Sequence, residues 1–169
     1  VSLKTIIDKC TVLVMNEEEA ELLFDHKNNP HLFDDFVRRN TSKYLVITDG
    51  SKGVHCFHND KIYSISPNPH TKVVETTGAG DAFASGFVAG LATHLPLEEA
   101  LKQGMVQAES VIGCVGAKNN LLIKGVAQGK IEQFQGKIDV HNLIKKEISE
   151  EKDLSLLTSF KQPFKKELN

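Results

Sequence analysis

The residues with the clearest chemical potential form a short run between an extended segment and an apolar, helix-like segment. Thr76–Phe83 reads Thr-Thr-Gly-Ala-Gly-Asp-Ala-Phe, with glycines at positions 78 and 80 and a carboxylate at Asp81. A glycine turn that leads into a helix presents unpaired backbone N–H groups and the positive end of the helix dipole. Such an end binds anions, including phosphate groups. The run therefore predicts an anion site beside an ionised carboxylate.

Two plainer interpretations of the same run stay open. Gly78 and Gly80 can form an ordinary tight turn, and Asp81 can be a residue that simply favours the start of a helix. The commoner nucleotide-binding patterns do not match. The dinucleotide fingerprint requires a third glycine where Phe83 stands, and a phosphate loop ending in Gly-Lys-Ser/Thr occurs nowhere in the sequence.

Two further stretches place polar residues after buried strands. Asn16 follows an apolar run at 11–15, and Glu19 stands at the third position of the helix expected next. This order suits a capping box, in which both side chains bond to backbone N–H groups at the helix start. The second stretch, 48–53, reads Thr-Asp-Gly-Ser-Lys-Gly, and a plain connection between two strands explains it equally well.

A family resemblance adds weight to the functional interpretation. Glu75–Phe83, continuing to Ser85-Gly86, closely resembles the C-terminal signature of the ribokinase-like (PfkB) carbohydrate kinases. The resemblance implies that Asp81 is the catalytic base. It also implies that the backbone amides of Gly78, Ala79 and Gly80 form the hole that receives the transferred phosphoryl group. Glu75 is a small departure, since the family usually has aspartate there.

The resemblance also implies metal sites. Asn16 and Glu19 match an Asn-x-x-Glu motif that lies near the phosphates and the magnesium shell in these kinases. A carboxylate in that place can hold a metal-bound water and so orient Mg²⁺. By the same resemblance, a potassium ion is expected beside Glu75 and Thr77.

A nucleotide loop follows from a third match. Thr48, Gly50 and Gly53 fit the family's Thr-x-Gly-x-x-Gly loop, which lies along ATP or ADP, and glycines there let the backbone approach the ligand closely. Lys52 lies within this loop, where it can contact a phosphate group or remain a solvated surface lysine.

The wall of the adenine site is implied further along the chain. Gly116 and Ala117 match the Gly-Ala turn of the resembled kinases. Those kinases usually have an asparagine about nine residues earlier, and Gln107 stands in that place here. Glutamine offers the same amide on a longer side chain, so the contact with the base stays open.

The alternation of strands and helices indicates an α/β layered fold. We expect a partial, three-layer ribokinase-like fold, with a mainly parallel central sheet and helices on both faces. Small residues at Ala82, Gly86 and Gly90 would line one face of the helix that follows the signature. The expected strands and extended segments are 11–15, 43–48, 54–58, 61–66 (a hairpin around Asn59-Asp60), 73–74 and 121–124. The expected helices are 3–9, 17–23, 31–39, 79 to about 94, 97 to about 114, a short turn at 131–134, and 139–150.

Composition excludes several classes of function. The chain has 169 residues, of which 40% are apolar and 25% are charged, as in an ordinary globular protein. A net charge of −2 gives no footprint for nucleic acid or for an anionic membrane surface. Cys10, Cys56 and Cys114 are widely spaced among apolar residues, which predicts buried thiols in a reducing, cytoplasmic setting rather than a metal cluster. No secretory leader is expected from the first residues.

The resemblance covers roughly residues 10–125 and corresponds only to the C-terminal half of such a kinase. We therefore expect residues 1–150 to be the nucleotide-binding portion and residues 151–169 to be a charged tail that is partly disordered. ATP and Mg²⁺ are the implied co-substrate and metal, and a sugar or a nucleoside is the implied acceptor. A non-catalytic nucleotide-binding remnant is the remaining alternative. The apolar surface against which the other half would pack should either form a homodimer or bind a separate N-terminal half.

Overall fold

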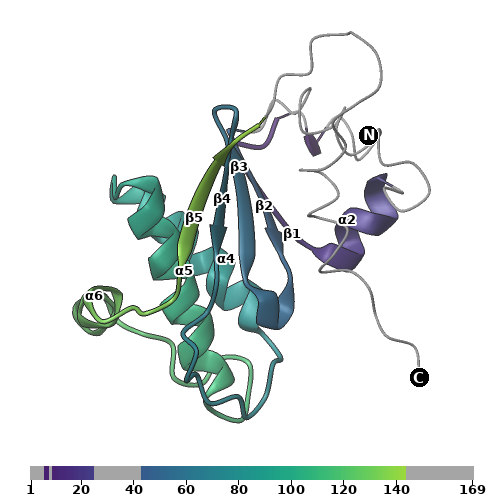
Figure 1. Ribbon diagram of the computed structural model, residues 1–169. Coiled ribbons are helices and arrows are strands. Elements are labelled where there is room, and N and C mark those ends of the chain that lie inside the picture. Colours follow the sequence, from purple (N-terminus) through teal and green to yellow (C-terminus); the bar gives the residue numbers. More distant parts are fainter. Residues whose placement is uncertain (1–5, 8, 25–42, 144–169) are drawn as a thin grey trace, which may run out of the picture.

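The computed structural model describes residues 6–7, 9–24 and 43–143, and Figure 1 shows their arrangement. The elements occur in this order: β1 (Val12–Asn16), α2 (Glu17–Phe24), β2 (Tyr44–Thr48), η1 (Gly50–Lys52), β3 (Val54–His58), β4 (Lys61–Ile65), α4 (Ala79–Ala92), α5 (Leu97–Ile112), α6 (Lys124–Glu132) and β5 (Ile138–Asn142). The expected helix at 31–39 and the expected tail at 151–169 lie outside the described residues.

The five strands form one sheet in the order β1-β2-β3-β4-β5. Only β1 and β2 are parallel, and the segment between them includes α2, as a parallel crossover requires. The other three pairs are antiparallel. The prediction of a mainly parallel sheet is therefore wrong for the described part of the chain, where the sheet is mixed. For β3 and β4 the reason is local, because Asn59 and Asp60 have φ of 49° and 58°, which suits a tight hairpin turn.

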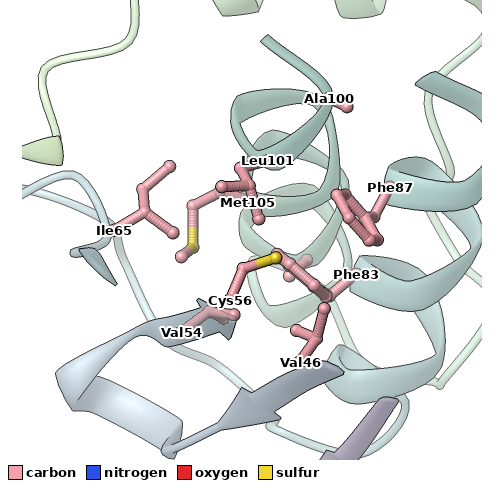
Figure 2. Close-up of a cluster of buried hydrophobic side chains, with 10 residues drawn as sticks. Val46, Val54, Cys56, Ile65, Phe83, Phe87, Ala100, Leu101 and Met105 are labelled. Carbon is pink, nitrogen blue, oxygen red and sulfur yellow. The ribbon is translucent and has the colours of Figure 1, made fainter. Parts of the chain in front are cut away.

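One face of the sheet is covered by α4 and α5. Val46, Val54 and Cys56 point from the strands toward Phe83 and Phe87 of α4, and all five side chains are buried. Figure 2 shows these side chains meeting Leu101 and Met105 of α5. Each fully buried aliphatic or aromatic side chain of this kind contributes about 1.5–3 kcal/mol through removal of its apolar surface from water. This cluster holds α4 and α5 against the sheet.

The opposite face carries α2 at the β1 side of the sheet, as Figure 1 shows. Ala20 of α2 is 1% exposed and packs with Met15, Leu45 and Ile47 of the neighbouring strands. Successive strand residues point to opposite faces, so the apolar runs of β1 and β2 supply both clusters. Helices on both faces make three layers, as the sequence predicts.

The predicted row of small residues on α4 is the surface that meets α5. A Cβ atom at Gly86 would lie 2.9 Å from the Gln103 carbonyl oxygen, and one at Gly90 would lie 2.9 Å from Ala100. In return, a Cβ atom at Gly104 of α5 would lie 2.9 Å from the Phe83 ring. The two helices therefore pack backbone to backbone, and larger side chains at these positions would force them apart.

Several expected elements differ in the structure. Residues 73–74 are not a strand, and the Val74 N–H donates to the Ile112 carbonyl at the end of α5 rather than to the sheet. The helix expected at 139–150 is wrong for its first residues: 138–142 form β5, which pairs with β4, and the rest lies outside the described residues. Residues 121–123 are irregular, and α6 runs from 124 to 132 in place of a short turn at 131–134.

Candidate functional site

The N-terminus of α4 is shaped by two glycines with different surroundings. Gly78 has a left-handed conformation, with φ of 82°, immediately before the helix. A Cβ atom there would lie 2.7 Å from the carbonyl oxygen of Ala117 and 2.8 Å from its Cβ atom. At Gly80 the space is open, since an added Cβ atom would meet nothing within 4 Å. The fold itself therefore requires glycine at position 78 and leaves position 80 free.

The first turn of α4 contains backbone donors that are not used by the described part of the chain. The N–H group of Ala79 donates to the Thr76 carbonyl at 3.2 Å, whereas the N–H groups of Gly80 and Asp81 have no acceptor among the described residues. No side chain caps the helix, and Asp81 is an exposed carboxylate in its first turn. Free N–H groups together with the positive helix end make this a place where an anion can bind.

The C-terminal ends of β1 and β2 bring the second group of predicted residues together. Asn16 and Thr48 are direct neighbours across the parallel pair. The capping box predicted from sequence is present: the Glu19 N–H donates to Asn16 Oδ1 at 2.8 Å, and the Asn16 N–H donates to Glu19 Oε2 at 2.9 Å. Both side chains are exposed, so the second carboxylate oxygen of Glu19 remains available to solvent.

The glycine loop after β2 is a single 3₁₀ turn. The Lys52 N–H donates to the Asp49 carbonyl at 2.9 Å, and the Asp49 N–H donates to the Gly53 carbonyl at 2.8 Å. Gly53 has φ of 104°, and a Cβ atom there would lie 2.0 Å from the Ile65 carbonyl oxygen, so this position also requires glycine. The Lys52 ammonium pairs with the Asp49 carboxylate at 3.2 Å, with its side chain 41% exposed.

A carboxylate joins the signature segment to the turn after α5. Glu75 Oε2 accepts a hydrogen bond from the Gly116 N–H at 2.9 Å. This bond lowers the pKa of Glu75, and the Thr77 hydroxyl lowers it further, so the group stays ionised at neutral pH. The N–H groups of Val74 and Glu75 both donate to the Ile112 carbonyl, at 2.7 and 3.2 Å. The signature and the Gly116-Ala117 turn are therefore fixed against each other.

Gln107 lies on α5 near this turn, with its amide already engaged. Its Nε2 donates to the Leu122 carbonyl at 3.1 Å, and its Oε1 accepts from the Leu122 N–H at 2.8 Å. The sequence left open a contact between Gln107 and an adenine base. In the structure both polar ends of the side chain bond to the chain's own loop.

The predicted residues thus fall into two groups. One joins Gly78–Asp81, Glu75 and the Gly116-Ala117 turn, and the other joins the ends of β1 and β2 with the loop at 50–53. Figure 1 shows η1, the loop before α4 and the turn after α5 at the same lower end of the molecule. Within the described residues, no cluster of three or more His, Cys, Asp or Glu side chains is arranged to hold a metal ion.

Sequence reasoning missed two polar pairs that hold the loops around this end. The Glu109 carboxylate accepts from the Asn68 N–H at 2.6 Å and from its side-chain amide at 2.5 Å. Ser110 exchanges hydrogen bonds with Asn120. The partners are 41 residues apart for Asn68 and Glu109 and 10 residues apart for Ser110 and Asn120, so no local sequence pattern predicts these bonds. The one available signal was polarity on the buried face of a helix, as at Ser110, which is 4% exposed.

Comparison with known proteins settles the class of protein. The family model described as "pfkB family carbohydrate kinase" matches residues 1–124. The chain belongs to this family. The ribokinase-like fold and the resemblance found in the signature are thereby confirmed.

Individual relatives include both sugar and nucleoside kinases. The chain is 29% identical over 130 residues to a ribokinase of Lactococcus lactis, covering 77% of this chain and 41% of that protein. It is 32% identical over 114 residues to a cytidine kinase of Thermococcus kodakarensis, covering 65% and 40%. Among solved structures, the nucleoside kinase of Methanocaldococcus jannaschii superposes with a TM-score of 0.64 at 28% identity, covering 78% and 42%.

The chain spans about two fifths of the length of these relatives. None of the described helices is long and apolar enough to cross a bilayer.

Proposed function

We propose that this protein transfers the γ-phosphoryl group of ATP to a hydroxyl group of a sugar, as the nucleotide-binding part of a carbohydrate kinase. The observation that carries the proposal is the start of α4, where Gly80 borders open space and two N–H groups lack an acceptor in the described chain. A glycine that the fold does not need lets a ligand approach the backbone closely. Membership of the carbohydrate kinase family makes a phosphoryl group the expected ligand.

Asp81 is the proposed catalytic base. It stands exposed in the first turn of α4, beside the free N–H groups of Gly80 and its own backbone. A carboxylate is a weak base, but the transition state of phosphoryl transfer is loose. The acceptor hydroxyl therefore needs orientation and late proton acceptance more than early deprotonation. The N–H groups would stabilise the charge that spreads over the phosphoryl oxygens, with Gly78 and Ala79 shaping the turn that aims them.

ATP is proposed to lie along the loop that follows β2. Thr48, Gly50 and Gly53 would contact it through their backbone, and the turn at Gly116 and Ala117 would wall the base. Gly53 closely packs against β4, which gives the loop a fixed shape before any ligand binds. Lys52 is paired with Asp49 in the structure, with the two side chains 41% and 10% exposed, and a phosphate group would compete with Asp49 for the Lys52 ammonium.

Magnesium would serve to neutralise charge on the phosphate groups. The donor set fits an outer-sphere role: Asn16 and one oxygen of Glu19 are held by the capping box, which leaves the second oxygen of Glu19 to bond a metal-bound water. A potassium ion is proposed beside Glu75 and Thr77, since an ionised carboxylate and a hydroxyl are both oxygen donors.

A nucleoside is the second candidate acceptor, because the relatives include a cytidine kinase and a nucleoside kinase as well as a ribokinase. The described residues carry no feature that favours one acceptor over the other. The cytoplasm is the proposed location, since Cys10, Cys56 and Cys114 are all free thiols and free thiols persist in reducing compartments.

Full activity is proposed to need the N-terminal half of a kinase, with a homodimer as the competing assembly. β1 is apolar and lacks a strand partner on its outer side within the described sheet, unlike the charged or proline-bearing edges of most sheets. Beside it lies a hollow of about 370 Å³, lined by Ile7, Leu13, Met15, Glu19, Leu22 and Leu23. Leu22 is 86% exposed there. Such a surface is suited to association with another folded segment.

The test is a kinase assay over a panel of sugars and nucleosides with ATP and Mg²⁺. It is run on this chain alone and on this chain mixed with the N-terminal half of the Lactococcus lactis ribokinase. Asp81→Asn should abolish turnover and leave ADP affinity nearly unchanged, because the base contacts the acceptor. The matched control is Asp139→Asn, which removes an exposed carboxylate on β5.

Turnover by the Asp81→Asn protein at the wild-type rate would show that another group is the base. Absence of ADP binding by calorimetry at millimolar nucleotide, with no turnover in either preparation, would favour the non-catalytic remnant.

A further inference from the structure

The last two turns of α5 bond to the loop that follows it through two reciprocal pairs. Gln107 and the Leu122 backbone exchange two hydrogen bonds, at 2.8 and 3.1 Å. One turn on, the Ser110 hydroxyl donates to the Asn120 carbonyl at 2.8 Å, and the Asn120 side-chain amide donates to the Ser110 carbonyl at 3.1 Å. Four hydrogen bonds therefore tie the far end of the loop to one face of the helix. These two pairs are called the α5 clamp below.

The same loop is held at its other end by the signature segment. Gly116 donates to Glu75, and Ala117 lies directly against Gly78, where only a glycine fits. The loop thus spans from the start of α4 to the clamp, with both ends fixed. Val115 within the loop is 70% exposed, and Val74, whose N–H donates to the Ile112 carbonyl at the end of α5, is 46% exposed. An apolar surface that the signature segment and the α5 clamp hold in place suits the flat face of a base.

Both polar atoms of the Gln107 amide are bonded to Leu122, so the amide cannot turn toward a ligand without breaking the clamp. The stem of the Gln107 side chain packs against Gly86 of α4, where an added Cβ atom would lie 2.9 Å from the Gln107 Cγ. Turning the amide toward a base would leave the N–H and carbonyl groups of Leu122 without partners. Each partly buried group left unpaired in this way is costly.

The segment around Asn68, between β4 and α4, is held by the same part of α5. Glu109 bonds to the backbone and side-chain amides of Asn68, whose Oδ1 in turn accepts from the Gln135 N–H at 2.5 Å. The C-terminal part of α5 therefore holds both the 113–123 loop and the segment around Asn68.

We infer that Gln107 and Ser110 are positioning residues, which hold the 113–123 loop in shape for the base of the nucleotide, and that Gln107 does not read the base. The inference rests on the proposed function. It predicts that loss of the clamp weakens binding of every purine nucleotide by one factor, because the cost is that of ordering the loop. A side chain that read the base would instead change the preference between adenine and guanine.

The experiment compares Gln107→Leu and Ser110→Ala with wild type. Gln103→Leu is the matched control, since it removes an amide one turn earlier on α5 that has no hydrogen bond to the loop in the described chain. ADP and GDP affinities are measured by calorimetry, and hydrogen exchange of the Leu122 amide is followed in parallel. Loss of a reciprocal pair should weaken both nucleotides about tenfold and speed exchange by a similar factor. The control should leave both unchanged.

Two results would overturn the inference. One is a Gln107→Leu protein that loses ADP affinity but keeps GDP affinity, which would mean that the amide reads adenine. The other is faster exchange at Leu122 with unchanged affinity for both nucleotides, which would remove the loop from the site. Wild-type protein that binds neither nucleotide would overturn the proposed function and the statement about the base, while the exchange data would still decide whether the clamp holds the loop.

Discussion

Replacing Gly78 with alanine tests the geometry of the α4 start most directly. The residue has φ of 82°, and a left-handed conformation costs a non-glycine residue roughly 1–2 kcal/mol. The new Cβ atom would also lie 2.7 Å from the Ala117 carbonyl oxygen, and overpacking of this kind costs about 1–3 kcal/mol. The sum, about 2–5 kcal/mol, is a large share of the roughly 5–15 kcal/mol that stabilises a domain.

Gly80→Ala is the matched control, because it makes the same substitution two residues away. Its Cβ atom would enter open space at the first turn of a helix, where alanine is favoured over glycine by up to about 1 kcal/mol. We therefore expect unchanged or slightly higher stability. We also expect loss of nucleotide binding, because the methyl group would occupy the space proposed for the phosphoryl group.

Urea unfolding of the 169-residue chain measures both effects, with calorimetry reporting nucleotide binding. A third variant, Gly78→Asn, separates the two costs, since asparagine tolerates the left-handed conformation but still carries a Cβ atom. Equal destabilisation by Gly78→Ala and Gly80→Ala would refute the reasoning. So would a Gly80→Ala protein that binds ADP as tightly as wild type.

Three further outcomes are expected. The Gly116 N–H lowers the pKa of Glu75, so the hydrogen bond contributes its full stability above the ordinary pKa of 4.5 and loses it as the pH falls through the lower pKa of the folded state. Glu75→Gln should therefore flatten the dependence of unfolding free energy on pH in that acid range, and an unchanged slope would contradict this. Glu109→Ala should lower the free energy of unfolding by about 1–3 kcal/mol and speed hydrogen exchange at the Asn68 amide. Continued protection of that amide would mean that other contacts hold the segment around Asn68. Gly86→Ala should cost about 1–3 kcal/mol by forcing α4 from α5, and calorimetric melting at the wild-type temperature would exclude this.

Local pattern predicted the elements whose type is evident from their own residues. The apolar runs at 12–16 and 44–48, the hairpin at Asn59-Asp60, and the helices that begin at 79 and 97 all lie within a few residues of their expected bounds. The expectations failed where a distant partner decides. Residues 139–142 were expected to begin a helix, yet pairing with β4 makes them part of a strand, because backbone bonding to a neighbouring strand overrides weak local preference.

The family and the candidate site residues could be predicted from sequence, since a long signature and motifs at the ends of strands are local features of the chain. The sequence could not distinguish Gly78 from Gly80, because the difference depends on Ala117, which only the folded chain brings against the helix start. The engagement of Gln107 with Leu122 was likewise decided by tertiary structure. Whether a side chain serves a ligand or its own fold depends on which partners packing brings within hydrogen-bond reach, and spacing along the chain does not contain that information.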